Sequence, residues 1–238
     1  MNASTVAPKY KKGGYLLAFF LFPAILCFIY YYFVVRKPLV SGDDSVFVKL
    51  AYFGPKQLAA NGKDTIYHSI PDFTFVNQEG KIITQKNYEG KMYVADFLSC
   101  SDRTVSTKLA AQYFNIQKKL SFINNFILLS HTVNPEKDSV PVLKQFAYEV
   151  HAIDNMWNVV TGDKKQLYNI ATNGYLVDVG TFDNFTFSKT LVLVDKERHI
   201  RGFYDGTSVT DVNRLQDEVR VLFAEYRMKA RKKKQNLQ

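Results

Sequence analysis

Thiols are scarce in this chain, which has only two cysteines among its 238 residues, Cys27 and Cys100. Cys27 lies inside a long apolar run, so Cys100 has no second thiol with which to form an internal disulfide or a dithiol metal site. Cys100 follows an apolar stretch, residues 91–98, at the point where a helix is expected to begin. A thiolate is stabilised at such a strand-to-helix junction, which makes Cys100 a candidate reactive thiol. The alternative is a small, half-buried side chain without chemistry.

Histidine is also scarce, with four residues in the chain. His131 ends a central apolar run and could bind a metal together with Cys100, although a lone histidine at a strand end is more often structural. Metal-ligand spacing is not found around the other three, His68, His151 and His199. Asp96 and Asp102 are not accompanied by a histidine or a nucleophile in a hydrolase pattern, so we do not expect an enzyme. Asp102 is better interpreted as the N-cap of the helix that follows it.

Charge is missing from Tyr15–Val35. At 1.5 Å per residue a helix of this length crosses the ~30 Å hydrocarbon core of a bilayer, so we expect one transmembrane helix over 15–35. A cleaved signal peptide is the alternative, but it has a shorter apolar region and a small-residue cleavage site, which is not found here. Three lysines precede the run and two basic residues follow it directly, which favours a cytoplasmic tail at 1–14. We therefore expect a single-pass protein of the inner (cytoplasmic) membrane whose domain faces the periplasm.

The net charge of +9 is concentrated at the ends of the chain. Basic residues flank the apolar run, and six more lie in a tail at 227–238: Arg227, Lys229, Arg231, Lys232, Lys233 and Lys234. The remaining basic residues roughly balance the 22 acidic ones, so the body is near neutral. This distribution argues against nucleic-acid binding and favours anionic lipid head groups or an acidic protein surface as the partner of the basic segments.

Hydrophobic periodicity predicts an α/β fold. Residues 36–70 contain glycine and proline among polar residues, so we expect a tether with limited structure of its own. Strands are predicted over 72–77, 81–84, 91–98, 126–130, 157–160, 190–195 and 200–204, and helices over 104–120, 139–148, 164–171 and 209–226. Strands that alternate with helices and end in a hairpin indicate a mixed sheet flanked by helices, in one domain over 71–226.

A series of short motifs follows in a characteristic order along this domain. They are Ile70-Pro-Asp-Phe, Gln78-Glu-Gly-Lys, Tyr93-Val-Ala-Asp-Phe, Val133-Asn-Pro-Glu-Lys-Asp, Val160-Thr-Gly and Leu193-Val-Asp-Lys with Ile200-Arg-Gly-Phe-Tyr-Asp-Gly-Thr after it. In order and spacing the chain resembles the Sco/SenC family from about residue 49 to 225. The resemblance implies a thioredoxin-like fold, a membrane anchor, and a copper chaperone that helps to assemble cytochrome c oxidase.

The resemblance also implies a copper site of two cysteines and one histidine, and this chain departs from it at each ligand. Without gaps, the two cysteine positions fall on Asp102 and Ser106; with a two-residue deletion they fall on Cys100 and Thr104. The histidine position falls on Phe187. Since carboxylate and hydroxyl oxygens suit copper poorly and phenylalanine is no donor, we expect neither a cofactor nor family-type copper binding, with Cys100 at most as a ligand.

The leading hypothesis is therefore a Sco/SenC-like, membrane-anchored protein of cytochrome c oxidase assembly or copper homeostasis that acts through protein contacts. An alternative is a membrane-tethered thiol redox protein that uses Cys100 alone, which requires a depressed thiol pKa. A further alternative is an interaction module that docks through its basic tail.

Overall fold

The computed structural model describes residues 13–31 and 49–236. The chain divides into two compact units, Met1–Val48 and Lys49–Gln238, and each is described by itself. In the first unit the described residues form one helix, α1 (Gly13–Tyr30), with Pro23 inside it. Across both described ranges, no helix is at once long enough and apolar enough to cross a membrane.

Several predicted segments fall partly outside the described residues. These are the cytoplasmic tail predicted over 1–14, the end of the membrane span predicted over 15–35, the first part of the tether predicted over 36–70, and the last two residues of the basic tail.

The body is built on a seven-stranded mixed sheet with the order β4-β3-β7-β6-β5-β8-β9. The three central strands, β7, β6 and β5, are parallel, and their neighbours β3 and β8 run antiparallel to them. The edge strands β4 and β9 pair antiparallel with β3 and β8. The strands of this sheet are β3 (Thr74–Asn77), β4 (Ile82–Thr84), β5 (Met92–Leu98), β6 (Phe126–Thr132), β7 (Trp157–Thr161), β8 (Thr190–Val194) and β9 (Ile200–Asp205). The helices are η3 (Gln85–Tyr88), α3 (Arg103–Leu120), α4 (Val140–Glu149), α5 (Lys164–Asn169), the π-helical turn η4 (Ile170–Gly174) and α6 (Val209–Gln235).

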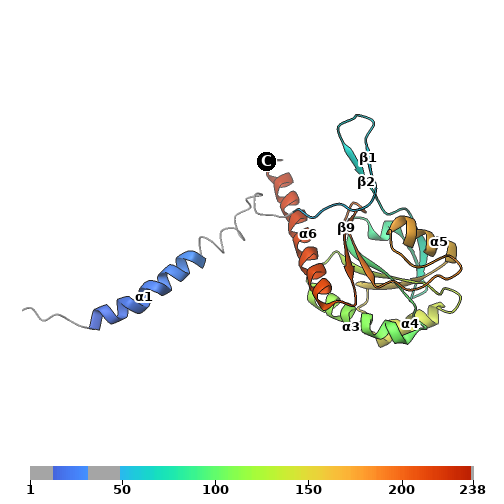
Figure 1. The fold of residues 1–238 in the computed structure, drawn as a ribbon, viewed down its shortest axis with the longest axis horizontal. Helices are drawn as coiled ribbons and strands as arrows, with labels where there is room; N and C mark the ends of the chain where they lie inside the picture. Colours follow the sequence, from blue (N-terminus) through green and yellow to red (C-terminus); the bar gives the residue numbers. More distant parts are fainter. Residues whose placement is uncertain (1–12, 32–48, 237–238) are drawn as a thin grey trace, which may run out of the picture. The chain divides into compact units, whose positions relative to one another are not determined.

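Both faces of the sheet are covered, which gives three layers (Figure 1). All seven residues of β5 and of β6 are buried, as expected for central strands with a helix on each side. Side chains of β5 alternate between the layers: Met92 and Val94 pack with α3, α4 and α6, whereas Tyr93 and Phe97 pack with η3, α5 and η4. The predicted three-layer arrangement around a mixed sheet is confirmed.

The predicted elements agree with the structure except at a few boundaries. The helix predicted over 164–171 is a short α-helix that continues as a π-helical turn to Gly174. The closing helix predicted to end at 226 instead continues to Gln235, so nearly all of the predicted basic tail is helical. Lysine and arginine have high helix propensity, and cations in a last turn interact favourably with the helix dipole.

The prediction of a tether with limited structure is wrong for residues 49–70. This part of the chain contains a small antiparallel hairpin of β1 (Lys56–Leu58) and β2 (Thr65–Tyr67). It is fixed to the body by Arg201, whose guanidinium donates to Leu50 O at 2.8 Å and to Ala51 O at 3.2 Å. The sequence did not predict these bonds, because both acceptors are backbone carbonyls and the side chains of the segment do not indicate them.

Candidate functional site

The loop between β5 and α3, residues 99–102, is held by the carboxylate of Asp138. The Cys100 N–H donates to one Asp138 oxygen at 2.9 Å, and the Ser101 N–H donates to the other at 3.0 Å. The Thr132 hydroxyl at the end of β6 also donates to this carboxylate. Asp138 is completely buried just before α4. One carboxylate therefore fixes the loop to the neighbouring strand and helix.

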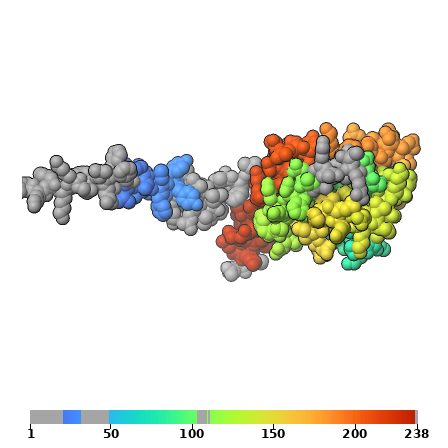
Figure 2. Space-filling model, turned by 90° about the horizontal axis from the view of Figure 1, so that it is seen from below, coloured from blue at the N-terminus to red at the C-terminus, as the bar shows by residue number. Residues whose placement is uncertain are grey.

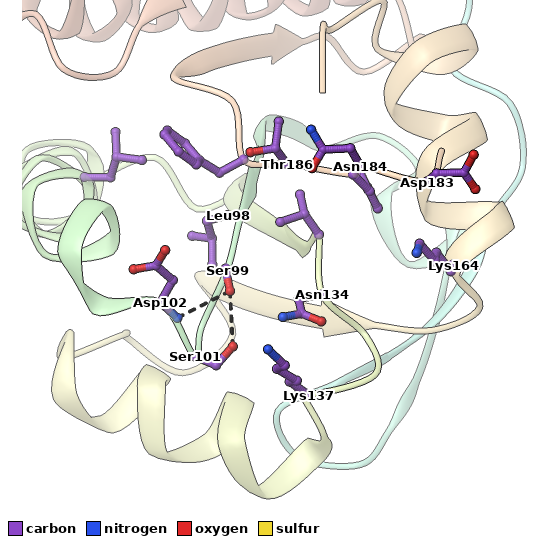
Figure 3. Close-up of a pocket in the computed structure, with 14 residues that line it drawn as sticks. Leu98, Ser99, Ser101, Asp102, Asn134, Lys137, Lys164, Asp183, Asn184 and Thr186 are labelled. Atoms are coloured by element: carbon purple, nitrogen blue, oxygen red, sulfur yellow. Dashed lines mark hydrogen bonds between the residues drawn. The ribbon is translucent and has the colours of Figure 1, made fainter. Parts of the chain in front are cut away.

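Next to this loop lies a hollow of about 800 Å³. Ser99, Ser101 and Asp102 line one side of it, and Lys164 and Asp183 lie on the opposite side (Figure 3). The other lining residues are Leu98, Leu109, Val133, Asn134, Lys137, Asn184, Phe185, Thr186 and Phe187. The lining combines lysines, carboxylates, amides and hydroxyls with a few apolar side chains. Such a surface offers both donors and acceptors to a ligand or partner.

Two of the three predicted ligand positions line this hollow. Asp102 immediately precedes α3, which is the N-cap position expected for it, and its N–H donates to Ser99 Oγ at 3.3 Å. Phe187 lines the hollow from the segment before β8. This segment is attached to β5 by a hydrogen bond, in which the N–H of the next residue, Ser188, donates to Phe97 O at 3.0 Å. Ser106 is the fourth residue of α3, and its side chain is outside the described part of the chain.

Cys100 is in the same loop but does not line this hollow. It is 4% exposed and lines a separate, smaller depression with residues of α4, among them Val142 and Phe146. Burial, together with the nearby carboxylates of Asp138 and Asp96, raises the pKa of the Cys100 thiol. This direction is opposite to the one that a thiolate nucleophile needs, so the structure argues against the prediction of a reactive thiol.

His131 is buried in the layer away from Cys100. Its ring stacks on Phe97 at 4.8 Å, and its Nδ1 lies 3.1 Å from Asp96 O. Burial lowers the pKa of His131 to about 4, so the ring is neutral at pH 7. His131 packs against Phe97, whereas Cys100 faces α4, so the structure does not bring the two side chains together. Within the described residues no three histidine, cysteine, aspartate or glutamate side chains are grouped so that they could hold a metal ion.

Asp96 belongs to a buried polar cluster beneath the loop. The Ser130 hydroxyl donates to its carboxylate at 2.7 Å, and the Trp157 indole N–H donates to Ser130 Oγ at 2.9 Å. Burial raises the pKa of Asp96 to about 7. Asp96 is thus an internal group of the core rather than one member of a carboxylate pair with Asp102.

Several residues around the hollow were missed from the sequence. Asp138 and Lys137 lie in the stretch Val133–Asp138, which was recognised as a motif without a role for its members. Its position directly after a buried central strand could have indicated that it lies beside the loop after β5, because parallel neighbouring strands end at the same edge of a sheet. Nothing in the sequence of residues 183–186 indicated that they lie beside the loop after β5.

With this geometry in place, the chain can be compared with known proteins. The SCO1/SenC family pattern matches residues 62–224, which is more than half of the chain. The chain belongs to the SCO1/SenC family. It is 31% identical over 129 residues to the SCO1 protein homolog of Bacillus subtilis (strain 168), and this match covers 54% of the chain and 64% of that protein.

Solved structures of SCO1/SenC proteins have the same fold. BsSco, described as a member of the Sco family of cytochrome c oxidase assembly proteins, matches with a TM-score of 0.58 and 24% identity, over 65% of this chain and 93% of that one. ScoI of Arabidopsis thaliana, solved with copper bound, matches with a TM-score of 0.55 and 20% identity, over 66% and 99% of the two chains. The predicted thioredoxin-like SCO1/SenC fold is confirmed.

Proposed function

We propose that this SCO1/SenC protein takes part in cytochrome c oxidase assembly or copper homeostasis through protein contacts at the hollow beside the 99–102 loop, without holding copper there. The proposal rests on one observation. The side chains of Asp102 and Phe187 line the hollow where the gapless alignment puts two of the family's copper ligands, and the only thiol of the loop faces α4 instead.

The residues at the hollow do not fit copper. Copper chaperones bind their ion with soft thiolate and imidazole groups, whereas this hollow is lined by carboxylate, amide, hydroxyl and ammonium groups. These groups suit hydrogen bonds and ion pairs with a polar peptide surface. Lys137 and Asp102 on the rim would meet opposite charges on such a partner.

The proposal includes an anchored topology. The apolar run 15–35 supports a single membrane span, with 1–14 in the cytoplasm, 36–48 as the connection and the body from residue 49 onwards in the periplasm. Oxidase assembly takes place at a membrane, so an anchored domain meets its partners at a high local concentration.

A copper titration tests the loss of the site. The full chain in detergent should show no tight one-to-one binding of copper and no thiolate-to-copper absorption band. The triple variant Asp102→Cys, Ser106→Cys, Phe187→His should gain both, because it restores soft ligands at the gapless positions. Tight one-to-one binding of copper by the unaltered chain would overturn the proposal. A triple variant that binds no copper would contradict the gapless alignment.

A deletion strain tests the role in the cell. Loss of the gene should lower terminal oxidase activity, and the unaltered gene should restore it. Lys137→Glu reverses a charge on the rim of the hollow and should restore less activity at equal protein level. Lys86→Glu, on η3 at the far edge of the sheet, is the matched control and should restore activity fully. Normal oxidase maturation in the deletion strain would exclude this function.

The thiol redox alternative finds no support in the burial of Cys100. The rate of alkylation of Cys100, measured against pH in a Cys27→Ser background, decides between the two functions. We expect slow alkylation that is still rising above the pH at which free cysteine titrates, because burial raises the thiol pKa. A titration below that of free cysteine would reinstate the alternative.

A further inference from the structure

The C-terminal part of α6 is an exposed, strongly basic helix. Every residue from Lys229 to Asn236 is exposed, so these last turns have no support from the core. The last acidic residue of the chain is Glu225, and six basic residues follow it: Arg227, Lys229, Arg231, Lys232, Lys233 and Lys234. Figure 2 shows this end of α6, in dark red, at the margin of the body rather than within its packed faces.

Cations so closely spaced repel one another along the helix, which costs stability. The helix dipole offsets part of this cost, because the C-terminal end carries partial negative charge. Lys229 is further compensated by Glu225, 2.9 Å away. An external anionic surface would weaken the repulsion among the cations further.

The chain joins the body beside this helix. Arg201 donates to Leu50 O and also contacts Glu225 of α6 at 3.3 Å, so one buried guanidinium bridges the start of the body and the helix. The ring of Tyr52 lies 4.3 Å from the same guanidinium. Leu50, next to the first residue of the body, is therefore linked through Arg201 to Glu225, which directly precedes the basic end of α6.

An exposed aromatic side chain accompanies the cations. Phe122 follows α3 and is 57% exposed, with its ring 6.4 Å from that of Phe223 on α6. The Arg227 guanidinium lies 5.8 Å from the Phe223 ring. Aromatic side chains next to basic ones are typical of surfaces that lie at the head-group level of a bilayer.

We infer that this basic–aromatic surface, made of Phe122 and α6 from Phe223 to Lys234, binds the anionic phospholipids of the membrane in which the chain is anchored. The inference rests on the proposed anchor over 15–35. Residues 36–48 between that span and the body reach at most about 45 Å when fully extended. The basic end of α6, close to Lys49, is then always within reach of the lipid head groups, whereas an acidic protein would have to be brought there.

The binding would orient the body. A lipid contact beside the attachment point would favour orientations of the body in which α6 faces the bilayer. The hollow beside the 99–102 loop would then be presented to a membrane-bound partner in a preferred direction.

Fluorescence quenching in vesicles tests this inference with the full chain. A dye is attached at Gln235→Cys in a Cys27→Ser background, and the vesicles contain a lipid with a quencher in its head group. We expect at least threefold stronger quenching with about 30% phosphatidylglycerol than with phosphatidylcholine alone. Raising the salt from about 50 mM to about 500 mM should remove most of the difference.

Two matched triple variants identify the surface. Arg231→Gln, Lys233→Gln and Lys234→Gln together should abolish the response to phosphatidylglycerol. Three exposed lysines far from α6, replaced together as Lys81→Gln, Lys86→Gln and Lys165→Gln, remove the same charge and should leave the response intact. Equal loss in both variants would overturn the inference, because the effect would then reflect net charge alone.

Flotation of the same samples with phosphatidylcholine vesicles tests the anchor separately, because neutral lipid offers nothing to the basic surface. Flotation without quenching in phosphatidylglycerol would overturn the lipid contact and leave the anchor in place. Quenching in phosphatidylglycerol without flotation in phosphatidylcholine would overturn the anchor and support the lipid contact. Failure of both would overturn both.

Discussion

The substitution Asp138→Asn should loosen the loop that shapes the hollow. The two loop N–H groups donate to different oxygens of the Asp138 carboxylate, at 2.9 and 3.0 Å. An asparagine keeps one oxygen and puts an NH₂ group in place of the other, so one loop N–H then faces a donor. Hydrogen bonds to a charged group contribute about 1.5–3 kcal/mol each, and a buried donor left without a partner costs further free energy. We expect the free energy of unfolding to fall by about 2–4 kcal/mol.

Urea denaturation of the full chain in detergent measures this change. The single tryptophan, Trp157, is fully buried and reports unfolding through its fluorescence. In a Cys27→Ser background, alkylation of Cys100 should become more than tenfold faster, because opening of the loop exposes the thiol. Asp183→Asn is the matched control: it removes an exposed carboxylate from the other side of the hollow and should change the unfolding free energy by less than about 0.5 kcal/mol. If Asp138→Asn left both the denaturation midpoint and the alkylation rate unchanged, the assigned role of Asp138 would be refuted.

Three further changes test the core and the connections of the body. Arg201→Gln leaves the buried Asp195 carboxylate without its 3.0 Å partner, so the free energy of unfolding should fall by about 3–5 kcal/mol in urea denaturation, and limited proteolysis should cut near residue 50. Burial raises the pKa of Asp96 from 3.8 to about 7, so its stabilising contribution is complete below pH 3.8 and is lost as the pH rises towards 7. The difference in unfolding free energy between the unaltered chain and Asp96→Asn should therefore shrink by about 2 kcal/mol from pH 5 to pH 7, and a constant difference would contradict this assignment. Gly180→Ala puts a Cβ 2.5 Å from Asn184 O at a φ of +76°, so the thermal midpoint should fall, whereas an unchanged midpoint would show that the loop beside the hollow adapts freely.

For much of the candidate site, the sequence predicted which positions along the chain contribute to it, but no more than that. The motif Tyr93–Phe97 located the strand before the loop, and Asp102 was expected at the start of the helix, where the structure has it. The direction of each side chain could not be predicted. Cys100 and Asp102 are two residues apart, yet one faces α4 and the other faces the hollow, because Asp138 fixes the turn between them. Asp138 lies 38 residues from Cys100 in the chain, so local sequence patterns carried no information about the contact.

By itself the sequence determined the layers of the fold, because strand and helix periods depend only on neighbouring residues. It also determined the family, since this follows from short motifs that occur in a characteristic order along the chain. The tertiary structure alone decided that the thiol of the loop is buried with a raised pKa, that Arg201 ties residues 50 and 51 to the body, and that the same guanidinium contacts Glu225 of α6. Each of these depends on contacts between residues far apart in the chain, and burial and charge around a group are properties of the folded packing.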